Sequence, residues 1–230
     1  PSFLLFFFVL SQRNYDLDNE TFKCLQRCAT LCNTSEFDNN SKVECYKRGD
    51  KAGQPKPGGR KIGFKEIVTL GDGSTEERVM WKPIGNASEA AMIKFCQDKK
   101  DIMEYRAEWP LNPKGKIPFN SKNKYQTHIH WDPENEQWVE EFKGAPERVT
   151  MRSSEIMVNG GEVVEFTQER RDQVDKLQTQ LSRMGMRVLG FAEKRLDKGA
   201  FPKDFVFDSE NVNFPIGEPD AEFDAKAAMA

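Results

Sequence analysis

Apolar residues recur at the three- and four-residue spacing of an amphipathic helix in two stretches, Asp18 to Cys32 and Thr167 to Met184. A third stretch continues from Gly85 to about Asp98, and its candidate N-cap is Asn86 or Ser88. These patterns predict three amphipathic helices separated by long segments with a different periodicity.

Between the helices, β-rich runs alternate with turn signals. Ile62 to Leu70 is expected to be a strand that ends at a Gly-Asp-Gly-Ser turn. Tyr125 to Trp131 and Gln137 to Phe142 flank Asp-Pro-Glu-Asn-Glu, which predicts a hairpin. Arg187 to Ala192 is a short apolar strand, and Pro146 suits the first turn of a short helix. We therefore expect an α+β fold, an antiparallel β-sheet flanked by helices.

The length and net charge limit the classes of protein to which the chain can belong. The 230 residues fit one large domain. A net charge of −3 argues against a nucleic-acid partner, which a basic surplus would favour. Five cysteines without a closely spaced framework suit a reducing compartment better than a disulfide scaffold.

The two ends differ from the rest of the chain. Pro1 to Leu10 is apolar, but ten residues rise only about 15 Å as a helix and cannot span a bilayer. The chain begins with proline, so we expect a fragment. Residues 1–18 are interpreted as an apolar, irregular segment, 19–215 as the domain, and 216–230 as a disordered tail. Pro1 to Leu10 and Gly217 to Ala230 are expected to lack stable packing.

Some side chains have two interpretations. Cys24, Cys28 and Cys32 share one helix face and could bind a soft metal or line a packed helix seam. His128 and His130 share one face of a strand, and packing is again favoured over a metal site. No metal ligands are therefore assigned. Trp131 and Trp138 flank the hairpin and are expected to pack across it.

Two polar segments carry the candidate chemistry. Phe119 is a large ring among polar neighbours, and such a ring is either core or a platform on which a purine stacks. Lys124 and Gln126 have the same strand parity, so we expect them to point to one side. Lys143 and Gly144 end a strand before a helix, where glycine allows close approach and free amides favour an anion.

These segments resemble the nucleotide-binding domain of P-type cation-transporting ATPases, in particular the sodium/potassium-type catalytic subunit. The likeness runs in order from about Asn19 to Pro215. It rests on Lys116 to Gln126, on Lys143-Gly144-Ala145-Pro146-Glu147, and on shorter blocks at 85–91, 187–191 and 201–215.

The resemblance implies roles for seven residues. Phe119 would stack on adenine, Lys143 and Gly144 would line the nucleotide pocket, and Arg187 would reach toward the phosphates. Glu89, Lys124 and Gln126 would surround the purine and ribose. Both lysines are expected to be partly solvated. Three positions depart from the family pattern: Asn86, Met151 and Met186.

The family's catalytic Asp-Lys-Thr-Gly-Thr motif does not occur in these 230 residues, so no catalytic residue is assigned. The resemblance implies an ATP-binding domain that presents ATP, with its Mg²⁺, to a phosphorylation domain outside this chain. Actuator domain and membrane helices would be further partners, at the cytoplasmic face of a membrane, the plasma membrane by analogy. The alternatives are a free-standing nucleotide-binding module and a scaffold that has lost binding.

Overall fold

A computed structural model describes residues 3–6, 16–37, 64–69, 73–80, 83–97, 99–158, 160–208 and 214–215. The chain divides into two compact units. Unit 1 contains residues 1–32 and 105–230, and unit 2 contains residues 33–104. The two units are described separately below.

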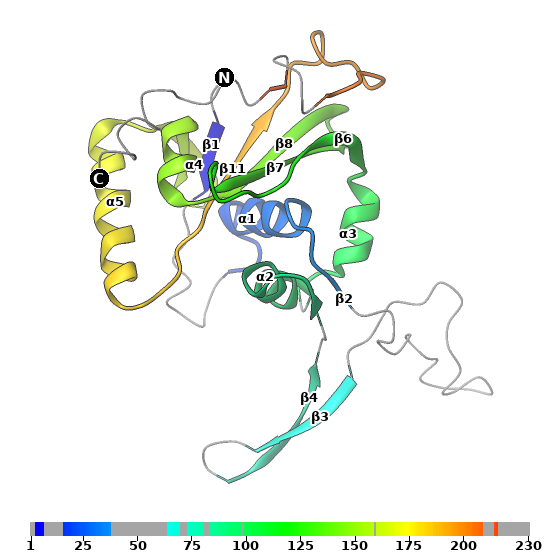
Figure 1. Cartoon of the computed structure of the whole chain (residues 1–230), viewed down its shortest axis with the longest axis vertical. Coiled ribbons are helices and arrows are strands. Elements are labelled where there is room, and N and C mark those ends of the chain that lie inside the picture. The colour runs from blue at the N-terminus through cyan, green and yellow to red at the C-terminus, as the bar shows by residue number, and fades with distance from the viewer. Residues whose placement is uncertain are drawn as a thin grey trace, which may run out of the picture. The chain divides into compact units, whose positions relative to one another are not determined.

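Unit 1 is built on one large sheet (Figure 1). Within the described residues the strands lie in the order β10 (Glu162–Glu165), β9 (Ser153–Val158), β1 (Phe3–Phe6), β11 (Gly190–Arg195), β8 (Gln137–Gly144), β7 (Tyr125–Asp132) and β6 (Leu111–Ile117). Neighbouring strands run antiparallel except β1 and β9, which are parallel. The predicted α+β class with a mostly antiparallel sheet is confirmed.

The N-terminal strand overturns one expectation. Phe3–Phe6 lies in the middle of the sheet, between β9 and β11, and Phe3 and Leu5 are almost fully buried. The ring of Phe3 lies 5.0 Å from that of Phe142, measured between centroids. The expectation that Pro1 to Leu10 lacks packing is therefore wrong for these four residues. Hydrogen bonding on both sides and an apolar core make the segment part of the sheet.

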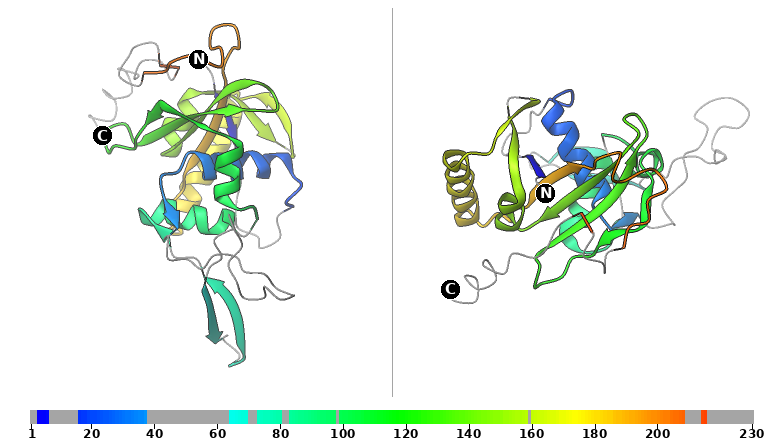
Figure 2. Two further views of the ribbon diagram at one scale, coloured as in Figure 1. Left: turned by 90° about the vertical axis from the view of Figure 1, so that its right-hand side faces the viewer. Right: turned by 90° about the horizontal axis from the view of Figure 1, so that it is seen from above.

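Helices cover both faces of this sheet. Helix α1 (Glu20–Leu31) packs on β8, β11 and β1. On the other face, α4 (Pro146–Arg152) and α5 (Gln168–Arg183) contribute Val149 and Val174 to the larger hydrophobic core. Figure 2 shows α1 and α5 on different sides of the strands. Residues 201–207 add three phenylalanine rings to the same core as α4.

The hairpin between β7 and β8 forms as expected. Asp132 accepts backbone hydrogen bonds from Glu134 (3.0 Å) and Asn135 (3.2 Å), which closes the turn. Trp131 and Trp138 are directly opposite in the register and meet edge to face with centroids 5.1 Å apart. Cross-strand packing of these rings is confirmed.

Unit 2 contains α2 (Ala87–Gln97) and two short sheets, one of β2 (Glu36–Phe37) with β5 (Pro83–Ile84) and one of β3 (Phe64–Thr69) with β4 (Thr75–Met80). Helix α3 (Ile102–Glu108) begins here and is capped by Asp101, whose Oδ1 accepts from the amides of Met103 and Glu104. Residues 38–63 and the tail from 216 onward lie outside the described residues.

The local sequence pattern predicted the bounds of the three helices to within a few residues. It did not predict several of the strands. Strand β6 contains Pro113 and Gly115, and its pairing with β7 shifts register between Leu111 and Lys116. Proline and glycine weaken the strand signal in the sequence, yet an edge strand tolerates both. Strand β11 begins at Gly190, three residues after the predicted start at Arg187.

Candidate functional site

Four strand ends meet at one end of the unit 1 sheet. Strands β6 and β8 end there, and strands β7 and β11 begin there (Figure 1). The register fixes this arrangement, because Gly144 faces both Tyr125 and Gly190, and Ile117 faces Thr127. Six of the seven sequence-predicted residues lie on or beside these ends. We call them the strand-end site: Phe119, Lys124, Gln126, Lys143, Gly144 and Arg187.

The segment between β6 and β7 presents Phe119 to solvent. Asn120 organises the turn: its carbonyl accepts from the Lys124 amide at 2.8 Å, and its Oδ1 accepts from the Asn123 amide at 2.7 Å. The Phe119 side chain is 58% exposed. A large ring held on the surface by a hydrogen-bonded turn is available for stacking, so the core interpretation of Phe119 is excluded.

Lys124 and Gln126 do not point to one side, contrary to the expectation from strand parity. Lys124 has φ +59° and precedes β7, so the alternation of strand side chains does not include it. Its ammonium lies 4.0 Å from the Glu147 carboxylate of α4. Gln126 is buried, and its Nε2 donates to the Cys32 carbonyl at the end of α1 (3.1 Å).

Gly144 is required by the backbone itself. A Cβ there would lie 2.6 Å from the Lys124 carbonyl oxygen and 2.6 Å from the Tyr125 Cβ. The Ala145 amide donates to that same carbonyl at 2.9 Å, so the oxygen is not free to move away. Local pattern found Gly144, but it assigned the close approach to a ligand rather than to the neighbouring strand.

Lys143 is buried, with 4% of its surface exposed. The expectation of partial solvation therefore holds for Lys124 and is wrong for Lys143. The reason lies in the sheet: Lys143 faces Gln126 on one side and Phe191 on the other, and Phe191 packs against the Cys24–Leu25 cluster of α1. The positively charged side chain of Lys143 therefore lies in the layer between the sheet and α1.

Arg187 is exposed and lies between the end of α5 and the start of β11. The helix ends through hydrogen bonds from the Gly185 amide to Ser182 (2.9 Å) and from the Met186 amide to Leu181 (3.1 Å), with Gly185 at φ +76°. Met184 and Met186 are both exposed. The strand-end site therefore has an exposed arginine on its β11 side.

Glu89, the seventh predicted residue, belongs to unit 2 and is described there. It is buried, and its Oε2 accepts from the Thr34 hydroxyl at 2.6 Å. Its backbone amide donates to Oδ1 of Asn86 at 3.0 Å. Asn86 is thus the N-cap of α2, a role that asparagine and aspartate fill about equally well.

The family described as P-type ATPase, cytoplasmic domain N, matches residues 69–216.

The chain belongs to this family.

Its relatives include cation-pump subunits. A sodium/potassium-transporting ATPase subunit alpha of Drosophila melanogaster is 35% identical over 207 residues, which cover 88% of this chain and 16% of the relative. The subunit alpha-2 of Sus scrofa is 35% identical over 207 residues, 89% of this chain and 17% of the relative. A potassium-transporting ATPase alpha chain 2 of Rattus norvegicus is 32% identical over 209 residues, with the same shares. The chain thus spans about a sixth of these relatives.

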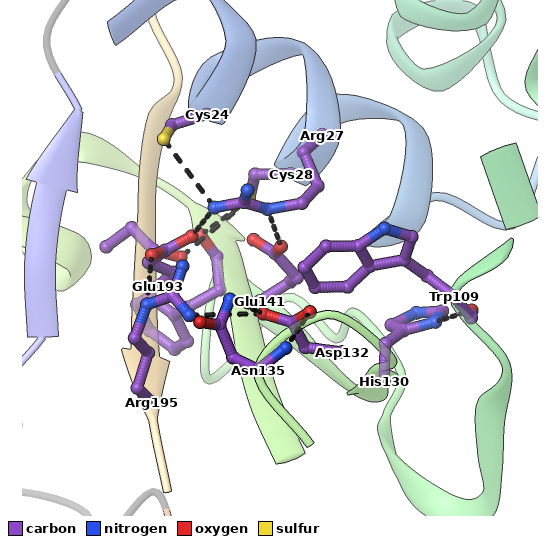
Figure 3. A network of polar contacts seen from close by, with 12 residues as sticks. Cys24, Arg27, Cys28, Trp109, His130, Asp132, Asn135, Glu141, Glu193 and Arg195 are labelled. Carbon is purple, nitrogen blue, oxygen red and sulfur yellow. Dashed lines mark hydrogen bonds and ion pairs between the residues drawn. The ribbon is translucent and has the colours of Figure 1, made fainter. Parts of the chain in front are cut away.

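In this P-type ATPase domain, an ion-pair network lies on the α1 face of the sheet (Figure 3). Arg27 of α1 contacts Glu141 of β8 (Nε to Oε1, 3.1 Å) and Glu193 of β11. Both carboxylates are buried, and the guanidinium carbon of Arg27 lies 4.9 Å from the centre of the Trp109 ring. Burial raises the pKa of Glu141, and the Arg27 charge opposes this rise.

The network continues to the hairpin turn. Arg195 lies 3.5 Å from Oε1 of Glu193 and 3.1 Å from Oδ2 of Asp132. The pKa of Asp132 is lowered although burial acts to raise it, because Asn135, the Glu134 amide and Arg195 donate hydrogen bonds to the carboxylate. Sequence patterns did not indicate this network, since its members come from four separate elements.

The side chains of Cys24, Cys28 and Cys32 are buried between α1 and the sheet, and His128 and His130 of β7 are also buried. The Cys28 thiol donates to the carbonyls of Phe142 (3.5 Å) and Ala192 (3.7 Å). Burial raises the pKa of Cys24 to about 11 and also raises that of Cys28, so both are thiols at neutral pH. His130 Nδ1 donates to the Trp109 carbonyl at 2.8 Å, and burial lowers its pKa to about 3.

These contacts are those of a helix seam, which was the favoured interpretation of the cysteines. In the described part of the chain, no group of three or more His, Cys, Asp or Glu side chains could hold a metal ion. None of the helices in the same residues is long and apolar enough to cross a bilayer.

Proposed function

We propose that unit 1 binds an adenine nucleotide at the strand-end site. In the full-length protein the domain presents ATP to a phosphorylation domain outside this chain, and ATP hydrolysis is coupled to cation transport across a membrane. One observation carries the proposal. Phe119, whose side chain is 58% exposed, lies at the same end of the sheet as Lys124, Arg187 and Gly144. Membership of the P-type ATPase domain N family supports it.

Each exposed group has a distinct part in this proposal. The Phe119 ring stacks on the purine, a contact worth roughly 1–3 kcal/mol in nucleic-acid sites. Lys124 and Arg187 supply exposed positive charge toward the phosphates. Lys143 and Gly144 line the site beside these groups, and Gln126 is directly opposite Lys143 in the strand register.

ATP fits these residues, because an exposed ring and several cations match a purine joined to a polyphosphate. In this proposal Mg²⁺ arrives with ATP, and its protein ligands lie outside this chain. The phosphorylated aspartate also lies outside it, since the 230 residues contain no Asp-Lys-Thr-Gly. The chain alone is therefore proposed to bind ATP and ADP without hydrolysing ATP.

The proposed partners are the phosphorylation and actuator domains and the membrane helices of the full-length pump. The domain would lie at the cytoplasmic face of that membrane, the plasma membrane by analogy with the relatives. The alternative is a free-standing, non-catalytic nucleotide-binding module. Both alternatives require the same strand-end site, and they differ in whether an Asp-Lys-Thr-Gly-Thr sequence precedes this chain in the transcript.

An NMR titration of the 230-residue chain with ATP, ADP and adenosine tests binding. We expect an ATP dissociation constant near ~1 mM, about −4 kcal/mol, because a few contacts must offset the cost of immobilising a flexible ligand. ATP and ADP should bind within several-fold of each other. Backbone signals of Phe119, Lys124 and Gly144 should shift.

Phe119→Ala should make ATP binding undetectable, since it removes the stacking surface. Leu111→Ala is the matched control, because Leu111 is also exposed but lies at the opposite end of β6. Lys124→Ala should weaken ATP more than adenosine, and Lys114→Ala on β6 should not. Equal binding by wild type and Phe119→Ala would refute the site. Steady phosphate release by the pure chain would refute the non-catalytic assignment.

A further inference from the structure

Lys124 of the strand-end site and Glu147 of α4 form an exposed ion pair. The ammonium and the carboxylate lie 4.0 Å apart, and the two side chains are 53% and 39% exposed. An ion pair this exposed contributes little to stability, because water solvates both charges and salt screens them. Another anion can therefore take the place of the carboxylate at little cost.

Backbone hydrogen bonds hold Lys124 next to the start of α4. Lys124 has φ +59°, a region that residues other than glycine rarely adopt. Its amide donates to the Asn120 carbonyl at 2.8 Å, and its carbonyl accepts from the Ala145 amide at 2.9 Å. Ala145 is the N-cap of α4, and Glu147 lies in the first turn of that helix. The two backbones therefore stay together when the charged side chains separate.

Glu147 also has an ordinary role at the start of its helix. A negative charge in the first turn is favourable, because the backbone amides there carry partial positive charge. Glu169 has the same place in α5, where Nε2 of Gln173 donates to its Oε1 at 3.5 Å. The length of α5, roughly 20 Å, separates Glu169 from the helix end that leads to Arg187. Glu169 is therefore a matched control for a role of Glu147 at the strand-end site.

We propose that Glu147 competes with the nucleotide phosphates for Lys124 and so limits the affinity of the strand-end site for phosphorylated ligands. In the free protein the carboxylate pairs with the ammonium. When ATP binds, a phosphate takes the place of the carboxylate, because a terminal phosphate carries about −1.5 to −2 charge near neutral pH and has three acceptor oxygens. The displaced carboxylate stays nearby and repels the phosphates. The inference rests on the proposed nucleotide site and assigns a residue that regulates it.

Competition and support by Glu147 have opposite consequences. If Glu147 competes for Lys124, Glu147→Gln removes the competing charge and raises the affinity for ATP. If Glu147 instead holds Lys124 in the orientation that binding needs, the same substitution lowers that affinity. Adenosine has no phosphate, so competition leaves its affinity unchanged. The sign of the change in ATP affinity therefore separates the two roles.

The experiment compares wild type, Glu147→Gln and Glu169→Gln by NMR titration of the 230-residue chain with ATP, ADP and adenosine. We expect Glu147→Gln to raise ATP affinity about two- to fivefold, the range of an exposed ion pair. ADP should gain less than ATP, because it carries less charge, and adenosine should not change. Glu169→Gln should bind all three ligands as wild type does. The gain from Glu147→Gln should shrink when salt is raised from ~0.05 M to ~0.5 M.

A second pair of variants tests whether Lys124 mediates the effect. In a Lys124→Ala background, adding Glu147→Gln should raise ATP affinity by a smaller factor than in the wild type, since the ammonium is gone. An equal gain in both backgrounds would overturn competition for Lys124. Should Glu147→Gln fail to fold, Glu147→Asp takes its place. It keeps the charge but withdraws the carboxylate, so it should raise ATP affinity by less, and an unchanged or lower affinity would overturn the inference.

The two proposals can fail separately. A wild-type chain that binds no ATP would overturn the nucleotide site and the inference with it. A wild type that binds ATP, together with a folded Glu147→Gln variant of equal or lower ATP affinity, would overturn only the competition. In the free protein, the side-chain signals of Lys124 should shift in Glu147→Gln and stay in place in Glu169→Gln. Unchanged Lys124 signals in Glu147→Gln would also overturn the competition, because no ion pair would then exist to be displaced.

Discussion

Gly144 of β8 and Gly190 of β11 face each other in the sheet, and a Cβ atom at either position would collide with its surroundings. At Gly144 the obstacle is backbone, the Lys124 carbonyl oxygen at 2.6 Å. At Gly190 it is the Val149 side chain of α4, at 2.8 Å. The two glycines let α4 and the turn before β7 close onto the strand ends that carry the candidate site.

We therefore predict that Gly144→Ala destabilises the protein by about 1–3 kcal/mol, the usual cost of forcing extra volume into a packed site. The cause is the fixed carbonyl of Lys124, so the Lys124 and Ala145 amide signals should also shift. Urea unfolding followed by tryptophan fluorescence measures the change. Gly199→Ala is the control, because its nearest neighbour is the flexible Asp197 side chain at 3.2 Å. Equal stability of both variants would contradict the prediction.

Arg27 is expected to be the most sensitive charged residue on the α1 face (Figure 3). Arg27→Met leaves the buried carboxylates of Glu141 and Glu193 without their shared cation, which should cost about 3–5 kcal/mol. Adding Glu141→Gln to Arg27→Met should recover part of this loss, and urea unfolding of both variants measures it. Lys23→Met on the same helix removes an exposed pair with Glu20 and should change little. Full additivity of the two substitutions would show that Arg27 and Glu141 are not coupled.

The N-terminal strand gives a third prediction. Leu5 is 1% exposed and pairs with Ala192 and Ile156 on either side, so Leu5→Ala should cost about 2–5 kcal/mol. Leu17→Ala, at a residue 49% exposed, should stay within about 0.5 kcal/mol of wild type. Thermal or urea unfolding distinguishes them. A Leu5→Ala variant as stable as Leu17→Ala would mean that β1 does not occupy the sheet in solution.

Glu140 should make stability depend on pH. It is fully buried, and burial raises its pKa to about 7, although Lys194, Thr127 and Arg152 act to lower it. Since the folded state holds this proton more tightly than the unfolded state, the stabilising effect is present at acidic pH. It is lost as pH rises toward 7.

Glu140→Gln removes this titration. Relative to wild type, the variant should gain about 2–3 kcal/mol of unfolding free energy between pH 5 and pH 8. Urea unfolding across that range measures the difference. Glu134→Gln in the exposed hairpin turn should follow the wild-type curve throughout. A Glu140→Gln curve parallel to wild type would show that Glu140 does not titrate in this interval.

The candidate site was predicted from the sequence in part. Phe119, Lys143 and Gly144 stand out locally, as a ring within a polar segment and as a lysine and glycine between a strand and a helix, but only the family resemblance favoured a nucleotide role for them, and that role stays a prediction. The prediction that Lys124 points to the same side as Gln126 was wrong. The alternation of strand side chains was applied to a residue at φ +59°, which lies outside the strand. The pairing of Arg27 with Glu141 and the contact between Gln126 and Cys32 had no sequence signal, since the paired residues lie 114 and 94 positions apart.

The sequence by itself determined the helices and turns that depend on residues only a few positions apart. Helices α1, α2 and α5 and the hairpin of β7 and β8 follow from spacing, caps and turn residues, which depend on neighbours a few positions away. Tertiary structure alone decided that Phe3–Phe6 lies between β9 and β11, that Lys143 is buried, and that adjacent Glu140 and Glu141 are buried on opposite faces. Strand partners and burial are set by contacts between distant segments, and a short window of sequence does not contain those contacts.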